Sequence, residues 1–331
     1  MWMENKGLFL FLISINCNFV MISGGKWLPS IDFHDSVIRS RNVKNEANKI
    51  GAFEVKNLGE AYQQSMKQFF RQAPACLEKD PTLPTMVMND GSVRTTFATS
   101  DSKSNPECLS DEIGVITKAF DQVDQIVIKI IEDIVEPGTL RYQTSENSGL
   151  IQDLSDSPVK QNLHVYTRKH TTAFDKKFMV PFHVDNGLYL LITPFPGHAL
   201  KIETSFGDII DTDDVKADSV LVLMGRALTD WLLQNSEKRT EFHAVPHAVE
   251  ALTLVPPISR SIFARMRVFP HAAVPINGTI KFKDIFFNED IANDDRTVTL
   301  TEKILGMFFL TFNLIPVAKK FTSVYLFSIY F

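Results

Sequence analysis

Cysteine is scarce in this chain. The 331 residues include 3 cysteines, Cys17, Cys76 and Cys108, and no two of them have Cys-x-x-Cys spacing. That scarcity excludes a cysteine zinc site and a disulfide-dense scaffold. Basic residues are not in excess either, since 34 Lys and Arg stand against 39 Asp and Glu. Without a basic stripe, nucleic acid is not an expected partner.

Long apolar runs are also missing. Neither end of the chain contains the roughly 20 apolar residues that a membrane-spanning helix needs. The sequence has no glycine-rich phosphate-binding loop and no internal repeat, which disfavours a nucleotide-dependent enzyme. What remains is ordinary globular composition, with 44% hydrophobic residues, 22% charged residues and a mean hydropathy of -0.02. One large domain or two small ones would fit this length.

The N-terminus has the layout of a targeting segment. Residues 7–14 (GLFLFLIS) are apolar, and a mixed stretch, INCNFVMISGG, follows to Gly25 and ends in small residues. This pattern predicts a cleaved signal peptide over residues 1–25, with a buried strand or a faulty gene start as alternatives. The expected location is therefore the secretory pathway, and the alternative is the cytoplasm. In the secretory pathway, Cys76 and Cys108 would be able to form a disulfide, and Asn277-Gly278-Thr279 would be a glycan acceptor.

The N-terminal half reads as strands and helices. Residues 27–33 and 51–57 resemble short strands, and a helical pattern follows to about Arg71. Residues 77–108 are rich in Pro, Asp, Ser and Thr and are predicted to form a loop.

Residues 109–135 give the clearest helix signal. Pro137-Gly138 ends it, and Asp111 and Glu112 suit its first turn. Apolar residues recur on one side at three- and four-residue spacing: Ile113, Ile116, Phe120, Val123, Val127, Ile130, Ile131 and Ile134. This stripe indicates core packing rather than chemistry.

Short strands dominate after residue 160. The candidates are 162–168, 178–185, 188–193, 199–203, 219–224, 242–249 and 260–269. Closely spaced short strands favour a sandwich or jelly roll. We therefore expect a β-rich α+β fold with a region of strands and helices (26–150), a β core (151–275) and a helical or irregular tail (276–331).

Ligand-type side chains stand close together in one of these strands. His183 and Asp185 are two residues apart, so on a strand they point to the same face. Imidazole and carboxylate together suit a first-row divalent metal. A third ligand would come from another strand, and His243 and His247 are the candidates. Two histidines and one carboxylate form the facial triad of non-haem Fe(II) oxygenases.

An arginine opens a later apolar strand. Arg260 lies 13 residues after His247, at the start of RSIFARM. Such a residue is either a solvated strand end or an anchor for a carboxylate, which a planar guanidinium binds with two hydrogen bonds.

From LPSIDF (28–33) to about Phe269 the chain resembles the isopenicillin N synthase-like, 2-oxoglutarate/Fe(II)-dependent dioxygenases. The segments that carry the resemblance are LPSIDF, GAFEVKNLG (51–59), HVDNGLYLLITPFPGHALKI (183–202), ADSVLVLMGRALTDWL (217–232) and PHAV (246–249). They occur in the family's order, and His247 follows Asp185 by 62 residues.

The resemblance implies a double-stranded β-helix, a jelly-roll barrel, with flanking helices from the N-terminal half. It places Fe(II) on His183, Asp185 and His247. His247 is preferred to His243, which would lie farther still from Arg260. The cosubstrate 2-oxoglutarate is expected at Arg260, with Tyr166 and Ser261 nearby.

The implied activity is oxidation of a substrate C–H bond by hydroxylation, desaturation or ring closure, with release of succinate and CO2. The substrate would be a small molecule or a peptide. Two departures from the family pattern stand out. The family has Arg-x-Ser about ten residues beyond the histidine, whereas this chain has Arg260-Ser261-Ile262 thirteen beyond, and His164 replaces an asparagine.

Two other functions fit the same residues. A barrel of this kind can bind a metal or small molecule without turnover, because folds outlast their sites. A zinc enzyme would use the same three ligands with a metal-bound water, but it would need a general base and would not use Arg260.

Overall fold

The computed structural model describes residues 28–33, 49–99, 105–135, 142–144, 150–151, 154, 157–168, 177–194, 200–212, 215–216, 218–251, 258–275 and 281–283. The predicted signal peptide, the glycan acceptor at Asn277 and nearly all of the predicted tail lie outside these residues. Among the helices that are described, none combines the length and the apolar character needed to cross a membrane.

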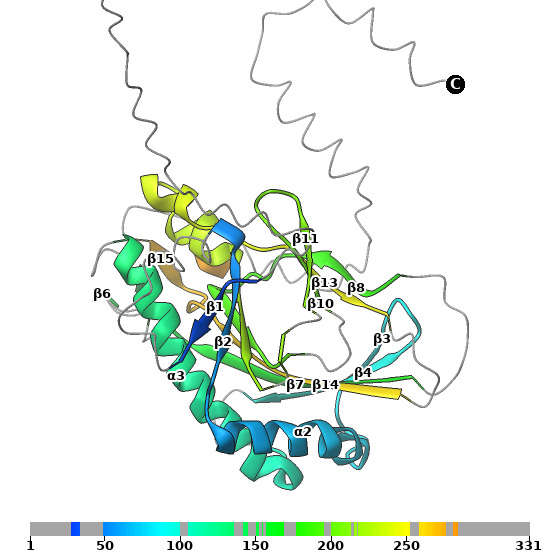
Figure 1. The fold of residues 1–331 in the computed structure, drawn as a ribbon. Coiled ribbons are helices and arrows are strands. Elements are labelled where there is room, and N and C mark those ends of the chain that lie inside the picture. Colours follow the sequence, from blue (N-terminus) through cyan, green and yellow to red (C-terminus); the bar gives the residue numbers. More distant parts are fainter. Residues whose placement is uncertain are drawn as a thin grey trace, which may run out of the picture. The chain divides into compact units, whose positions relative to one another are not determined.

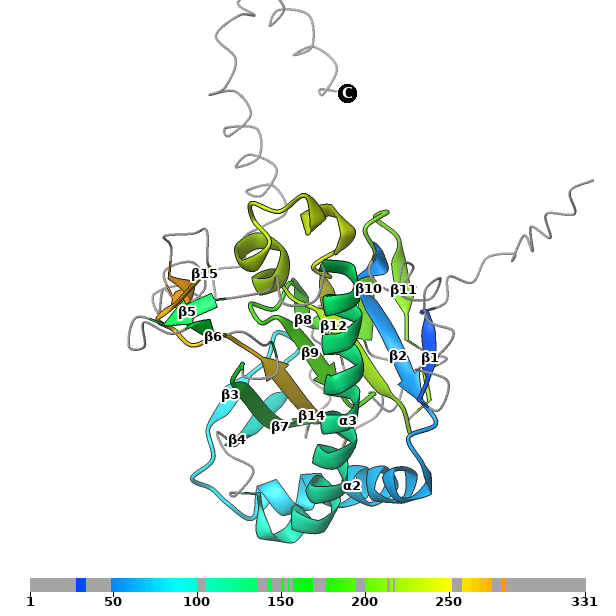
Figure 2. The same cartoon turned by 90° about the vertical axis from the view of Figure 1, so that its left-hand side faces the viewer.

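Two long helices pack together and onto the largest sheet. α2 (Glu60–Glu78) contacts α3 (Ser110–Val135) as well as β7 (Val159–Arg168) and β14 (Ile258–Arg267). The helix predicted over 109–135 is confirmed. Its apolar stripe from Ile113 to Ile131 is buried, because that side of α3 covers one face of the sheet (Figure 2).

The largest sheet has eight strands. Their spatial order is β1-β2-β12-β9-β14-β7-β4-β3. The strands not yet given bounds are β1 (Ser30–Asp32), β2 (Ala52–Lys56), β3 (Thr85–Val87), β4 (Val93–Thr99), β9 (Tyr189–Ile192) and β12 (Val220–Met224). Only the β1–β2 pairing is parallel among the pairings of this sheet. Strands from both halves of the chain therefore share one sheet.

Two smaller sheets complete the β structure. A four-stranded sheet has the order β11-β10-β13-β8, with β8 (Phe178–His183), β10 (Leu200–Glu203), β11 (Ile209–Asp211) and β13 (His247–Glu250). A three-stranded sheet pairs β15 (Ala273–Pro275), β5 (Tyr142–Thr144) and β6 (Leu150–Ile151). Short helical turns form at η1 (Glu107–Leu109), η3 (Ala227–Leu232) and η4 (Glu237–Glu241).

The main core lies between the eight-stranded and the four-stranded sheets (Figure 1). One buried cluster joins Leu190 and Ile262 of the large sheet to Leu200 and Val249 of the small one. Strand alternation sends the remaining side chains of the large sheet toward α3, where the Phe263 ring lies 5.6 Å from that of Phe120. Two layers thus enclose a space that is lined by alternate residues of each strand.

Two of our predictions about elements were wrong. The segment 77–108 is not simply a loop, because it contains the hairpin β3–β4, which extends the large sheet beside β7. The strand predicted over 242–249 begins only at His247, and Phe242 to Pro246 are not in a strand. Their backbone bonds elsewhere: the Val245 amide donates to the Met224 carbonyl across 3.0 Å.

A disulfide joins the ends of the two long helices. Cys76, near the end of α2, is bonded to Cys108 of η1, with Cα atoms 6.0 Å apart. The pairing considered from the sequence is therefore present in the structure. It ties the last turn of α2 to the start of α3, and the hairpin β3–β4 lies between the two cysteines in sequence.

Candidate metal centre and adjoining cavity

Three of the predicted ligands converge at one end of the space between the sheets. His183 ends β8, His247 begins β13, and the two are register partners in adjacent strands. Asp185 follows β8 by two residues. The potential ligand atoms of these residues all lie within 4.8 Å of one another. His183 Nε2 is 3.8 Å from Asp185 Oδ1, and His247 Nε2 is 3.6 Å from Asp185 Oδ2.

Both imidazole rings are oriented by a hydrogen bond between Nδ1 and a backbone carbonyl. His183 Nδ1 lies 2.9 Å from the Pro181 carbonyl oxygen, and His247 Nδ1 lies 3.3 Å from that of Val245. A carbonyl oxygen can only accept a hydrogen bond, so Nδ1 carries the proton in each ring and the Nε2 lone pair faces Asp185. Such bonds to Nδ1 are typical of histidines that ligate metals through Nε2.

The carboxylate completes this donor set. Asp185 Oδ2 is buried, and no hydrogen bond reaches it within the described part of the chain. A buried carboxylate oxygen without a partner is costly unless a cation satisfies it. Burial also lowers the pKa of His247, an effect that the charge of Asp185 opposes, so the ring is held in its neutral form. The three residues therefore fit a divalent metal ion.

His243 is not part of this group. Its Nε2 faces the carbonyl oxygen of Glu203 at 3.4 Å, and burial lowers its pKa. The structure brings His247 and not His243 to His183 and Asp185, which is the arrangement expected from the sequence.

The loop that carries Asp185 is held by close backbone contacts. The Arg226 amide donates to the Asp185 carbonyl at 2.9 Å, and the Gly225 amide donates to that of Leu188 at 3.0 Å. A Cβ atom at Gly225 would lie 2.2 Å from the Gly187 carbonyl oxygen, far inside van der Waals contact. Glycine is therefore required at 225 for this loop to dock against the segment that follows β12.

A cavity of about 180 Å³ extends from the three ligands into the core. Its apolar wall comes from both sheets: Val180, Leu200 and Val249 of the four-stranded sheet, and Leu190, Ile192, Ile262, Ala264 and Met266 of the eight-stranded sheet. Its polar wall belongs to the eight-stranded sheet and consists of Lys160, Asn162, His164 and Tyr166 on β7 and Arg94 on β4. The polar residues of β7 alternate along the strand, so they share the inward face.

His164 is neutral in this wall. Its Nδ1 lies 2.9 Å from the hydroxyl oxygen of Thr96. Burial, with a smaller contribution from the nearby charge of Arg94, lowers the pKa of His164 to about 3.

Tyr166 lies between two arginines in adjacent strands. Arg94 of β4 and Arg260 of β14 are both its register partners, so all three side chains are on the inward face. Burial raises the pKa of Tyr166, while the charge and hydrogen bond of Arg94 and the charge of Arg260 oppose that rise.

Arg260, which we expected to bind the cosubstrate, makes protein contacts and is not among the residues that line the cavity. Its Nη1 donates to the Glu250 carbonyl at 3.1 Å. Burial lowers its pKa to about 10, an effect that the nearby carboxylates of Asp90 and Glu250 oppose. Ser261 is buried on the opposite face of β14, because successive residues of a strand alternate, and it does not line the cavity.

Arg94 is the residue that the sequence reasoning missed. It falls in the segment predicted to be a loop, and the only signal for it is the β-compatible run VRTTFAT (93–99). Its Nε is buried and lacks a hydrogen-bond partner among the described residues.

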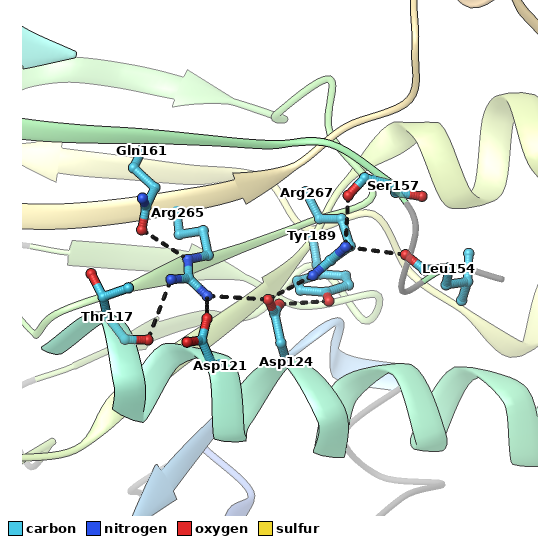
Figure 3. A network of polar contacts seen from close by, with 9 residues as sticks. All are labelled: Thr117, Asp121, Asp124, Leu154, Ser157, Gln161, Tyr189, Arg265 and Arg267. Carbon is cyan, nitrogen blue, oxygen red and sulfur yellow. Dashed lines mark hydrogen bonds and ion pairs between the residues drawn. The ribbon is translucent and has the colours of Figure 1, made fainter. Parts of the chain in front are cut away.

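The other arginines of β14 lie on the opposite face of the sheet, away from the cavity. Figure 3 shows Arg265 and Arg267 directed at α3, where Asp124 lies between them. Arg265 Nη1 is 2.6 Å from Asp121 and 3.3 Å from Asp124, and Arg267 Nη2 is 2.8 Å from Asp124. The Tyr189 hydroxyl donates to the second oxygen of Asp124 at 2.7 Å. This buried network attaches α3 to the sheet and leaves neither arginine for the cavity.

No known family profile matches this chain, and no curated protein matches its sequence. Solved structures do match its fold. The rice dioxygenase for auxin oxidation is 14% identical, with a TM-score of 0.55, over 78% of this chain and 93% of that one. Dioxygenase for auxin oxidation 1 from Arabidopsis thaliana, solved as a complex with 2-oxoglutarate, is 16% identical with a TM-score of 0.53 over 74% and 93%.

A third solved structure is that of JOX2 in complex with 2OG, Fe and JA. It is 12% identical, with a TM-score of 0.53, over 79% of this chain and 84% of that one. At such low identities the likeness concerns the fold. The chain has the fold of the 2-oxoglutarate/Fe(II)-dependent dioxygenases, in agreement with the resemblance noted in the sequence.

Proposed function

We propose that this protein is a non-haem Fe(II), 2-oxoglutarate-dependent oxygenase. One observation carries the proposal. In a fold shared with such dioxygenases, His183, Asp185 and His247 place two imidazoles and one carboxylate within 4.8 Å of one another at the end of a cavity. Three ligands on one side of a metal leave positions open for cosubstrate and dioxygen. We also infer that the eight-stranded and the four-stranded sheets together form a double-stranded β-helix.

The residues around the metal have separate tasks. His183 and His247 would bind iron through Nε2, and the Pro181 and Val245 carbonyls hold the rings in that orientation. Asp185 would supply the charge that balances part of the dication. When bound, Fe(II) provides the redox chemistry by which dioxygen is activated and 2-oxoglutarate is decarboxylated.

The polar end of the cavity suits the cosubstrate. 2-Oxoglutarate has a keto acid at one end, which chelates the metal, and a second carboxylate at the other. Tyr166 supplies a hydroxyl for that far carboxylate, and positive charge is close by because Arg94 and Arg260 flank Tyr166 in the sheet. The stoichiometry is one substrate C–H bond oxidised per 2-oxoglutarate and dioxygen consumed, with succinate and CO2 released.

The apolar wall indicates the substrate's environment. Leu190, Ile192, Leu200, Ile262 and Met266 present only hydrocarbon and a thioether to the cavity. A substrate bound there would have its reacting carbon in apolar surroundings that exclude water. A small molecule fits this cavity best, and hydroxylation, desaturation and ring closure are the outcomes open to it.

Anaerobic addition of Fe(II) and then 2-oxoglutarate tests the proposal. We expect a visible charge-transfer absorbance in the wild-type protein and none in Asp185→Ala, with unchanged far-ultraviolet circular dichroism. Decarboxylation of 2-oxoglutarate under air should follow. Chelation without decarboxylation, with or without a panel of small-molecule substrates, would instead indicate a binding protein. Tight Zn(II) binding that leaves 2-oxoglutarate unbound would indicate a zinc enzyme.

We further propose that the protein matures in the secretory pathway. The Cys76–Cys108 bond supports this proposal, because structural disulfides persist in oxidising compartments. Expression in a eukaryotic host with N-terminal sequencing is the test. A mature N-terminus near residue 26 supports the proposal, whereas an intact Met1 together with two free thiols at positions 76 and 108 contradicts it.

A further inference from the structure

Two guanidinium groups flank Tyr166, which is one more than the expected pairing with a carboxylate requires. Tyr166 on β7 is flanked by Arg94 on one side and Arg260 on the other, each directly opposite it in the sheet. One carboxylate needs one fork of guanidinium donors. The two arginines differ in surroundings, and the difference indicates which of them faces a ligand.

Arg260 is occupied by the protein itself. It is 8% exposed, its Nη1 donates to the Glu250 carbonyl on β13, and the negative charges of Asp90 and Glu250 are close by. These contacts connect β14 of the large sheet to β13 of the small one. A guanidinium with carboxylates and a carbonyl around it is poorly placed to receive a further anion.

Arg94 is placed to receive one. It lines the cavity, and it hydrogen-bonds the Tyr166 side chain. Its Nε is buried without a hydrogen-bond partner in the described part of the chain, and its Nη2 donates to a weak acceptor, Met86 Sδ, at 3.5 Å. A buried guanidinium N–H that lacks an acceptor is costly, and a carboxylate would satisfy it.

We propose that Arg94, together with the Tyr166 hydroxyl, binds the far carboxylate of the cosubstrate, and that Arg260 is a positioning residue for Tyr166. This inference rests on the proposed function and deepens it. It moves the anion-binding role from the last strand of the core to the hairpin β3–β4, which pairs with β7 and follows α2 in the chain.

A ligand that lacks the far carboxylate isolates the interaction. Pyruvate has the keto acid of 2-oxoglutarate but no second carboxylate, so it reports on the metal centre alone. Both compounds would be titrated anaerobically into Fe(II)-loaded protein, with the charge-transfer absorbance as readout. The variants are Arg94→Gln, Arg94→Lys and Arg260→Gln, and the exposed Arg239→Gln is the matched control.

Arg94→Gln should weaken 2-oxoglutarate by roughly 10- to 100-fold, the range for losing a charged hydrogen-bonded partner, while pyruvate affinity changes less than about twofold. Arg94→Lys should give an intermediate loss, because it retains charge but not the fork. Arg260→Gln should lose less than Arg94→Gln, and Arg239→Gln should match the wild type.

Several results would overturn the assignment. Equal loss of pyruvate and 2-oxoglutarate in both Arg94 variants would mean that Arg94 only supports the structure. A selective loss in Arg260→Gln that equals or exceeds the loss in Arg94→Gln would return the carboxylate to Arg260. If the wild type binds neither keto acid, the proposed function fails instead, and that result is distinct from the other two.

Discussion

Replacement of Asp124 by alanine should destabilise the protein severely, whereas the same change at Asp121 should not. Both aspartates lie on α3, and both bind Arg265. Their side chains differ in exposure, at 3% for Asp124 and 62% for Asp121. The two variants therefore make the same substitution in the same helix, once at a buried position and once at an exposed one.

The magnitude follows from the partners that each aspartate leaves behind. Without Asp124, the buried Arg267 loses its anion at 2.8 Å and the Tyr189 hydroxyl loses its acceptor at 2.7 Å. Removing one partner of a buried ion pair costs about 3–5 kcal/mol, and the better helix propensity of alanine returns only about 0.5 kcal/mol. The Asp121 carboxylate is open to water, which screens its pairing with the buried Arg265, so this pair contributes about 0–1 kcal/mol.

Urea unfolding followed by circular dichroism measures both variants, with the disulfide intact and metal absent. We expect Asp124→Ala to lose about 4 kcal/mol of unfolding free energy, or roughly 8–16 °C in Tm, and Asp121→Ala at most about 1 kcal/mol. Similar small losses in both would refute the reasoning, because the network would then contribute nothing beyond a surface ion pair.

Other predictions concern the metal, pH and the disulfide. His247→Ala should weaken Fe(II) binding by at least about 100-fold because it removes a ligand. His243→Ala should change Fe(II) affinity by less than about twofold. Equilibrium dialysis with metal analysis measures both affinities, and the reverse order would mean that His243 is the ligand. The pKa of His164 falls from 6.5 to about 3 on folding, so its contribution to stability is complete above pH 6.5 and is lost as the pH falls toward 3. Between pH 6.5 and 5 the wild type should therefore lose up to about 2 kcal/mol more than His164→Asn, and parallel pH profiles in urea unfolding would contradict this. The double variant Cys76→Ser/Cys108→Ser opens a loop with a sequence separation of 32 residues and should lose about 3–4 kcal/mol, which reduction of the wild-type protein should reproduce.

Local periodicity accounts for what the sequence predicted well. α3 was predictable because its apolar residues recur with the helical repeat over seven turns, so the signal accumulates. The closeness of His183 and Asp185 was expected from their spacing on a strand, although β8 ends at His183 and Asp185 lies in the loop that follows. Both features depend on residues that are neighbours in the chain.

Pairing between distant strands accounts for what was missed. The hairpin β3–β4 is rich in threonine and lies in a polar segment, so nothing local distinguishes it from a loop. Arg94 acquires its position only when β4 pairs with β7, about 70 residues later in the chain. The inward face of Arg260 follows from its register with Tyr166, but its contacts with Glu250 depend on the second sheet.

The contact between Gly187 and Gly225 shows that a site can depend on positions that contribute no atoms to it. Any side chain at 225 would push the Asp185 loop away from the segment after β12. In a library that varies every residue and is sorted for metal binding, substitutions at position 225 should therefore be lost as completely as substitutions of the three ligands. By contrast, Gly114 has open space where a Cβ would go and should score as tolerant. The absence of a side chain at position 225 is thus as much a requirement of this centre as the ligands themselves.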